Sequence, residues 1–321
     1  MPCLCARRVC LEQAAPRLFR LQISLLIPAY NAAGYLPRLE QSVRAQTSPF
    51  AEILCHDDGS ADATSEIIKQ LGWEGTCSTQ NRGPAAARNQ LLHAANFEWV
   101  HFHDADDLLE PSFVERMAIA VNANPRADVV VCQMDWLFED SREVYRAWRY
   151  EQEQLSQDSL SACVKNPIGV IACVYRREKL KEIGGFKENY RTWEDGDLHV
   201  RLAAAGAHFV VVPEILSIGL RHNAGASADH DSVDSDRVRQ LVTYGIDYPS
   251  CRAVYEEAEK LSLRLFEQDQ AVPRVDNLLS LCAAGNHRVP NSNRWWWQLA
   301  GRFLPAKTVM AIRRNLRLLM H

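Results

Sequence analysis

The sequence predicts an α/β fold in which helices cover a sheet of parallel strands. Between residues 23 and 136, apolar runs of strand length alternate four times with amphipathic runs of helix length. This alternation is typical of parallel strands joined by crossover helices. A chain of 321 residues can bury one large core. Acidic clusters follow two of the predicted strands, at the edge where such folds bind ligands.

The elements of the first half follow from their periodicity and their breaks. The predicted strands cover 23–27, 51–60, 97–107 and 127–136, and the predicted helices cover 32–46, 61–71, 81–95 and 110–124. Pro28 ends the first strand, and Ser60 or Asp62 can cap the second helix. A Gly-Pro break at 83–84 precedes the third helix.

The pattern weakens after Trp136. Residues 141–157 are polar and favour a helix, 170–175 favour a buried strand, and 192–206 favour a helix that opens with acids. A strand-like run ends near 223, and helical periodicity follows from about 229. We therefore expect three parts, which are a mobile tail at 1–21, a catalytic domain at 22–228 and a helical C-terminal region at 229–321.

Composition excludes several classes of protein. The net charge is −4, so no global basic field would draw the chain to nucleic acid. The ten cysteines are scattered, and we expect those within apolar runs, at 55, 132 and 173, to be buried thiols. This usage favours a reducing compartment. The first twenty residues lack a continuous apolar run, so we expect a cytoplasmic protein.

The stretch HFHDADD at 101–107 holds two histidines and three aspartates. If it is a strand, His101 and His103 share one face and point away from Asp104. They could form an H-x-H metal pair of a hydrolase, or they could fill core positions as neutral imidazoles. Strand parity favours the core interpretation.

Asp104 and Asp106 suit a different chemistry. Two carboxylates one residue apart at a strand end can hold Mn²⁺ or Mg²⁺, whose remaining ligands are phosphate oxygens and water. Such an ion would neutralise charge on a departing nucleoside diphosphate. A D-x-D pair alone is a weak signal, because chance pairs are common in loops.

The surrounding motifs strengthen this signal. SLLIPAYNAAGYL, HDDGSADAT, NRGPAAARN, HFHDADDLLEP, GGF, WEDGDLHVRLAAAG and LRHN occur in this order between residues 23 and 228. In order and spacing they resemble the family 2 glycosyltransferases of GT-A fold, which are inverting enzymes. The resemblance implies an αβα sandwich with a mostly parallel mixed sheet. The histidines at 101 and 103 depart from it, because the family carries apolar residues there.

The resemblance implies a role for each matching residue. The nucleotide would be bound by Ala29, Tyr30, Asn31, Asp57, Asp58, Gly83, Arg88, Asp104 and Arg221. Tyr30 would lie flat against the base, and Asp58 is preferred over Asp57 as the acceptor for a uracil edge. Arg88 would face acids or phosphate, with a structural salt bridge as the alternative.

The same resemblance assigns the metal and the chemistry. Asp106 and His222 would bind Mn²⁺ or Mg²⁺, and Asp195 would be the catalytic base. Trp193 and Glu194 would shape the site of the acceptor or the donor sugar. Asp107 fits the acidic pattern, but we expect it to cap a helix.

The C-terminal end combines basic and apolar residues. After Arg288 it contains no acid, and it includes three consecutive tryptophans at 295–297. An apolar stripe over 309–319 has arginines on another arc. Such a helix could lie on the inner face of an anionic membrane, or it could pack on the catalytic domain.

These observations predict a metal-dependent hexosyl- or N-acetylhexosaminyltransferase. It would move a sugar from UDP to a hydroxyl of a glycan or a lipid-linked acceptor, in cell-surface polysaccharide or related glycan synthesis. Two rival hypotheses are a non-catalytic sugar-nucleotide or glycan-binding protein of this fold and the H-x-H hydrolase.

Overall fold

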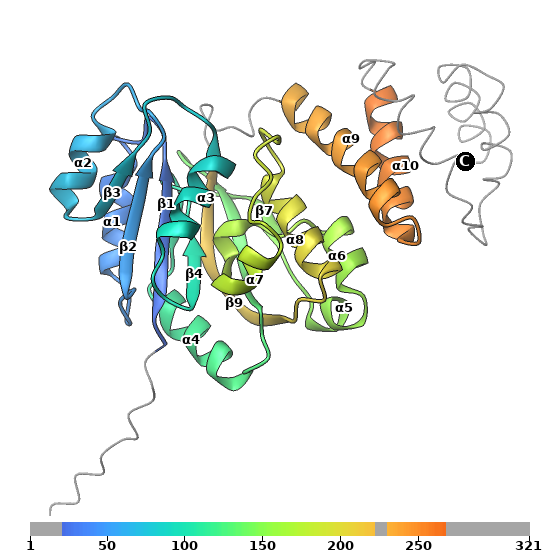
Figure 1. The fold of residues 1–321 in the computed structure, drawn as a ribbon, viewed down its shortest axis with the longest axis horizontal. Helices are drawn as coiled ribbons and strands as arrows, with labels where there is room; N and C mark the ends of the chain where they lie inside the picture. The colour runs from blue at the N-terminus through green and yellow to red at the C-terminus, as the bar shows by residue number, and fades with distance from the viewer. Residues whose placement is uncertain (1–20, 222–229, 268–321) are drawn as a thin grey trace, which may run out of the picture.

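A computed structural model describes residues 21–221 and 230–267. Within them, nine strands form one mixed sheet in the order β3-β2-β1-β4-β8-β6-β9-β5, with β7 paired to β6 (Figure 1). β3, β2, β1 and β4 are mutually parallel, and β6 is parallel to β9. The predicted α/β architecture is confirmed.

The strands are short, apart from β6 and β9, which have 10 and 13 residues. Their bounds are β1 Ile23–Ala29, β2 Glu52–Asp57, β3 Glu74–Cys77, β4 Trp99–Phe102, β5 Leu108–Leu109, β6 Val129–Phe138, β7 Val144–Trp148, β8 Cys173–Arg176 and β9 Phe209–Arg221. Because β1, β2 and β4 run in the same direction, the loops after them meet at one edge of the sheet.

The helices connect and cover these strands. Their bounds are α1 Leu36–Arg44, α2 Thr64–Leu71, α3 Pro84–Ala94, α4 Phe113–Ala123, α5 Gln152–Gln157, α6 Ser159–Lys165, α7 Arg177–Glu182, α8 Glu194–Ala204, α9 His230–Asp247 and α10 Arg252–Glu267, with a short 3₁₀ turn at Val170–Ala172. α3 packs on β1 and β2, and α4 packs on β6 and β9. None of the helices in the described residues is long and apolar enough to cross a membrane.

The core lies where the apolar runs predicted it. Leu25, Leu26 and Ile27 of β1 are fully buried, as are Val129 to Val131 of β6. Continuous apolar strands of this kind are covered on both faces by helices. The cysteines at 55, 132 and 173 are also buried free thiols, as expected.

The prediction that Pro28 ends the first strand is wrong, because β1 continues through it to Ala29. Most of the other failed local predictions lie where the sequence pattern was weak. Residues 141–157 were expected to be helical, but their first part forms β7 and only Gln152–Gln157 is helical. β3 was missed because its four residues are all exposed and carry no apolar pattern. Residues 170–175 begin as a 3₁₀ turn before β8. The N-cap of α2 is Ala63, without a side-chain cap.

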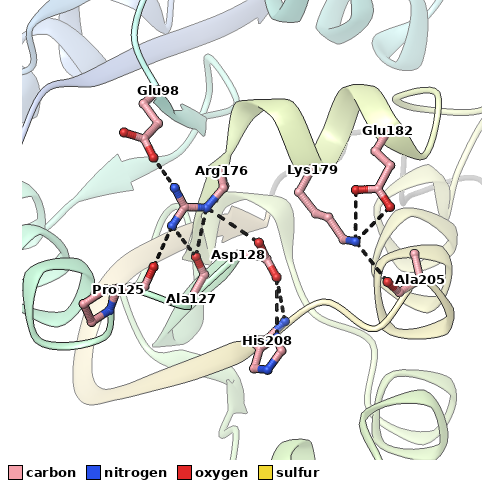
Figure 2. A network of polar contacts seen from close by, with 9 residues as sticks. All are labelled: Glu98, Pro125, Ala127, Asp128, Arg176, Lys179, Glu182, Ala205 and His208. Carbon is pink, nitrogen blue, oxygen red and sulfur yellow. Dashed lines mark hydrogen bonds and ion pairs between the residues drawn. The ribbon is translucent and has the colours of Figure 1, made fainter.

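A polar network fixes the sheet edge opposite the acidic loops (Figure 2). Arg176, at the end of β8, forms ion pairs with Glu98 and Asp128 and donates to the carbonyl oxygens of Pro125 and Ala127. Asp128 also accepts a hydrogen bond of 3.0 Å from the backbone N of His208. The chain ends that flank β4, β6, β8 and β9 are thereby held together.

The predicted helical region begins with two long helices. α9 and α10 lie side by side at the end of the molecule opposite α2 and β3 (Figure 1). α10 packs on α6, which in turn packs on α8. The rest of the predicted helical region, including the basic helix over 309–319, lies outside the described residues.

Candidate active site

The loops after β1 and β2 form one side of the candidate site, at the edge of the sheet where the acidic clusters lie. The backbone N of Asp58 donates to the carbonyl O of Ala29 over 2.8 Å. Asn31 has a φ of 49° and accepts a hydrogen bond from Ala61 N through its side-chain oxygen. This held turn leaves Tyr30 half exposed, with a relative exposure of 50%. Tyr30 therefore presents an accessible ring beside the ends of β1 and β2.

Asp57 and Asp58 are both buried but differ in their hydrogen bonds. Asp57 Oδ1 accepts from Ser60 N at 3.0 Å, which is a turn-forming contact. Asp58 Oδ2 accepts from the backbone N atoms of Arg82 and Gly83, at 2.9 and 2.7 Å. Asp58 Oδ1 is buried and has no hydrogen-bond partner among the described residues. A buried acceptor without a partner is rare in proteins and suits a donor on a bound ligand.

Gly83 makes this geometry possible. Its φ is 95°, a conformation that favours glycine, and it immediately precedes α3. The turn aims its N–H at Asp58 and starts the helix that carries Arg88. The predicted turn at Gly83 is therefore present.

Arg88 joins two acidic segments that are far apart in sequence. Its Nη2 lies 2.6 Å from Asp104 Oδ1, and its Nη1 lies 2.5 Å from Glu194 Oε1. The guanidinium is almost fully buried and stacks on the ring of Phe186. Burial lowers the pKa of Arg88, but the two carboxylates outweigh it and raise that pKa above its ordinary value. The predicted contact of Arg88 with acids is therefore present as a double ion pair.

The loop after β4 carries the D-x-D pair. The side chain of Asp104 is 32% exposed, and that of Asp106 is partly buried. Arg38 donates to the carbonyl O of Asp106 over 2.9 Å and pairs with Glu139 at 2.8 Å. α1 thus fixes the backbone on which these carboxylates stand.

Asp107 does not cap a helix, so that prediction is wrong. It is buried, and its Oδ1 accepts a 2.7 Å hydrogen bond from the backbone N of Leu220 in β9. Burial, with the nearby Asp106 and Asp104, raises the pKa of Asp107 well above its ordinary value. The side chain ties the D-x-D loop to the end of β9.

Asp195 lies in the first turn of α8, beside the Arg88 ion pairs. Its Oδ1 accepts from Gly196 N at 2.7 Å. Burial and the charge of Glu194 raise the pKa of Asp195 to about 7, against the lowering effects of Arg88 and of the Gly196 hydrogen bond. A carboxyl group with this pKa can exchange a proton with a hydroxyl near neutral pH.

His199 supports the same turn. Its Nδ1 lies 2.7 Å from the carbonyl O of Asp195, and its Nε2 lies 2.9 Å from the hydroxyl of Tyr175. Burial lowers the pKa of His199 to about 4, so the ring is neutral at pH 7. The carbonyl requires the proton on Nδ1, and Tyr175 then donates to Nε2.

The other predicted residues occupy different surroundings. Trp193 has a φ of 65° at the start of α8, and its ring lies against the guanidinium of Arg237. Arg221 ends β9, with its guanidinium 4.7 Å from the ring centre of Tyr145. His222 lies outside the described residues.

His101 and His103 belong to the core. Both are fully buried, and His101 Nε2 lies 3.2 Å from His103 Nδ1. His101 Nδ1 lies 2.7 Å from the carbonyl O of Cys173, and its ring packs against the rings of Phe50 and Phe113. Burial lowers the pKa of His103 to about 3, so it is neutral at pH 7. The core interpretation is confirmed.

The donor set at the edge fits a hard divalent cation. The described residues contain no group of three or more His, Cys, Asp or Glu side chains that could hold a metal ion. Mn²⁺ and Mg²⁺ commonly take only one or two carboxylates and complete their shells with phosphate oxygens and water. Asp106, on a loop braced by Arg38 and Asp107, is a suitable ligand of this kind.

The sequence interpretation missed Arg38 and the role of Asp107. Arg38 is one of several charged residues in an amphipathic helix, and no local motif marks it. Its partners Asp106 and Glu139 lie 68 and 101 residues away. Only the packing of α1 on β5, and its contact with the residue that follows β6, brings these partners together.

The chain resembles known proteins in sequence and in fold. It is 34% identical over 123 residues to "Putative glycosyltransferase EpsH" of Bacillus subtilis, covering 37% of this chain and 35% of that protein. It is 28% identical over 203 residues to "Succinoglycan biosynthesis protein ExoO" of Rhizobium meliloti, covering 60% of this chain and 58% of that protein. The chain thus spans between about a third and three fifths of these two relatives.

Solved structures share the architecture over most of the chain. S. aureus TarS 1-349 in complex with UDP-GlcNAc superposes with a TM-score of 0.70 at 19% identity, covering 92% of each chain. A mannosyltransferase from Pyrobaculum calidifontis in complex with GDP-Man and Mn²⁺ gives a TM-score of 0.58 at 18% identity, covering 92% of this chain and 87% of that one. The fold is therefore GT-A. The profile of "Glycosyl transferase family 2" matches residues 24–184, and the chain belongs to that family.

Proposed function

We propose that this chain is an inverting glycosyltransferase that moves a sugar from UDP to a hydroxyl of a glycan or lipid-linked acceptor. The observation that carries the proposal is the cluster around Arg88. It joins Asp104 on the D-x-D loop to Glu194, next to Asp195, whose pKa is raised to about 7. A base poised near neutral pH stands beside acids that suit a nucleotide and its metal.

The proposed position of the nucleotide is supported by the Oδ1 atom of Asp58, which can accept a hydrogen bond from the base. The uracil edge has an N–H donor, and Asp58 Oδ1 is a buried oxygen without a partner among the described residues. Tyr30 is accessible on the same edge and would lie against the base. Asp104, held by Arg88, would accept from the ribose hydroxyls.

The transfer end of the site follows from Asp195. As the acceptor oxygen attacks the anomeric carbon, Asp195 takes its proton, and the bond from that carbon to the diphosphate breaks. Asp106 and His222 would hold Mn²⁺ or Mg²⁺, which supplies positive charge near the leaving diphosphate. Arg221 and the D-x-D loop would place further charges around the diphosphate. Trp193 and Glu194 would lie beside the sugar.

The first experiment is a calorimetric titration of UDP with and without Mn²⁺. We expect micromolar binding that requires the metal, and Asp106→Asn should lose the metal-dependent part. Asp140→Asn, an exposed acid after β6, is the matched control and should bind like wild type. Binding of GDP in place of UDP would correct the base, whereas metal-independent binding would contradict the role of Asp106.

Asp58 and Asp57 provide a matched pair of neighbouring acids. We expect Asp58→Asn to weaken UDP binding about 10- to 100-fold, because its amide would turn a donor toward the donor of the base. Asp57→Asn keeps the oxygen that accepts from Ser60 and should change the affinity little. The two dissociation constants decide the assignment, and the reverse order would exchange the roles.

Transfer itself separates this proposal from a non-catalytic binding protein. Purified protein is incubated with UDP-GlcNAc, UDP-glucose or GDP-mannose, and release of the nucleoside diphosphate is followed with and without added glycans. Glycan-dependent release supports a transferase. Metal-dependent UDP binding without any release would favour the non-catalytic alternative.

A further inference from the structure

Helix α9 contacts the segment that leads into the acidic turn of α8. Asp236 Oδ2 accepts hydrogen bonds from the backbone N atoms of Arg191 and Thr192, at 2.8 and 2.9 Å. The hydroxyl of Thr192 lies 3.3 Å from the same oxygen. Asp236 is only 6% exposed and Arg191 is exposed, so a largely buried carboxylate accepts hydrogen bonds from a partly buried backbone.

Two further residues of α9 hold Trp193. Gln240 is fully buried, and its Nε2 donates to the carbonyl O of Trp193 over 2.6 Å. The guanidinium of Arg237 lies 4.7 Å from the centre of the Trp193 ring. Arg237 is itself anchored by a 2.7 Å hydrogen bond to the carbonyl O of Val164 in α6. The segment is therefore held at its backbone and at its side chain.

Trp193 needs such support because its backbone is left-handed. A bulky residue with a φ of 65° is uncommon, and such conformations persist where surrounding contacts enforce them. Trp193 is the residue before α8, so its conformation sets the direction in which Glu194 and Asp195 leave the loop. The contacts from α9 thus act one residue away from the Arg88–Glu194 ion pair.

We propose that α9 is a positioning element of the active site, in which Asp236, Arg237 and Gln240 hold Trp193 in the conformation that aims Glu194 and Asp195. The proposal rests on the function proposed above for Asp195. The family profile ends at residue 184, so these contacts of α9 with the segment before α8 lie in a part of the chain that the profile does not cover. The helical region would then be required for turnover and not for nucleotide binding.

The test compares two acids of the same helix. Asp236→Ala removes the acceptor for Arg191 and Thr192, whereas Asp236→Asn keeps one oxygen that can accept both bonds. Asp234 is the matched control, because it is also 6% exposed and pairs with Arg264 of α10 rather than with the loop. Asp234→Ala removes a buried acid from α9 without touching the segment at 189–193.

Catalytic consequences are measured as kcat and as UDP affinity. We expect Asp236→Ala to lower kcat about 10- to 100-fold, because a displacement of about 1 Å can cost 100-fold. Its UDP dissociation constant should equal that of wild type, and Asp236→Asn should regain most of kcat. Asp234→Ala should keep kcat within about twofold. An equal loss in the Asp234 and Asp236 variants would indicate general destabilisation and overturn the proposal.

Hydrogen exchange tests the same contacts without relying on activity. In Asp236→Ala, the amides of Arg191 and Thr192 should exchange faster, while the peptides of β1 and β6 keep their protection. Unchanged exchange at 189–193 would overturn the proposal, as would faster exchange with an unchanged kcat. If wild type transfers no sugar, the function proposed for Asp195 fails, and exchange alone decides whether α9 holds this segment.

Discussion

Asp195→Asn is expected to abolish sugar transfer while UDP binding is retained. A positioned base contributes about 100- to 10,000-fold to a rate, and asparagine cannot accept the proton of the acceptor hydroxyl. Asp195 lies at the start of α8, and its described contacts are with Gly196 and His199, not with the Asp58 end of the site. Calorimetry with UDP and a transfer assay on the same preparation check both parts. Turnover within tenfold of wild type would remove Asp195 from the mechanism.

The pH dependence of wild type should report the same group. The pKa of Asp195 is raised to about 7, and only its ionised form can act as a base. We therefore expect kcat/KM to fall about tenfold for each pH unit below 7. A profile that stays flat from pH 7 down to pH 5 would mean that another group, with an ordinary acid pKa, takes the proton.

Stability should change in the opposite direction to activity. Because the folded-state pKa of Asp195 lies above its ordinary value of 3.8, its protonated form stabilises the fold; this contribution is full below pH 3.8 and is lost as the pH rises from there through about 7. Asp195→Asn removes the buried charge, so we expect a higher Tm than wild type at pH 8 and little difference at pH 4. Each kcal/mol corresponds to about 2–4 °C for a domain of this size. If Asp195→Asn instead has a lower Tm than wild type at pH 8, the protein stabilises the ionised carboxylate of Asp195.

Arg88→Met is expected to have the largest effect on folding. Arg88 is the buried cation between Asp104 and Glu194, and its removal leaves two carboxylates without their ion pairs. Breaking such a pair costs about 3–5 kcal/mol, which predicts a fall in Tm of roughly 6–20 °C. Arg88→Lys keeps the positive charge but cannot bridge both acids, so its Tm should lie between that of wild type and that of Arg88→Met.

Arg82→Met is the matched control for this prediction. Arg82 pairs with Glu188 at 2.8 Å, but the two side chains are 53% and 43% exposed. Exposed pairs contribute about 0–1 kcal/mol, so Tm should stay close to that of wild type. Thermal denaturation of the three arginine variants at pH 7 provides the comparison. Equal effects of Arg88→Met and Arg82→Met would contradict the buried network.

The arginine also predicts a shift in the pH profile. Arg88 lowers the pKa of Asp195, against burial and Glu194. In Arg88→Lys the charge is less well placed, so the acid limb of kcat/KM should move to higher pH. If the acid limb of kcat/KM moves to lower pH instead, solvent reaches Asp195 once the ion pairs of Arg88 with Asp104 and Glu194 are broken.

Local patterns predicted most of the fold, because burial imposes them residue by residue. The apolar runs that became β1, β2, β4 and β6 are continuous, and the helices between them keep their spacing. β3 and β7 were missed because their residues are largely exposed, and their pairing with β2 and β6 depends on the neighbouring strand. An exposed edge strand leaves little apolar signal in a sequence.

The residues of the candidate site were likewise predictable from the sequence only where their positions depend on local features. The sequence by itself determined that acids follow β2 and β4 and open α8, since strand ends and helix starts are local features. It also determined that His101 and His103 share one face, because side chains alternate along a strand. These inferences need only the chain's own period.

Only the tertiary structure decided which charges meet. Arg88 pairs with Asp104 at a separation of 16 residues and with Glu194 at 106, and Asp107 binds the backbone of Leu220 at 113. The hold of α9 on Trp193 likewise joins segments 44–47 residues apart. Such contacts are selected by the packing of whole elements, and no local period encodes them. The sequence thus determined where the acids lie along the chain, and the tertiary packing decided which of them are paired and which one has a pKa raised to about 7.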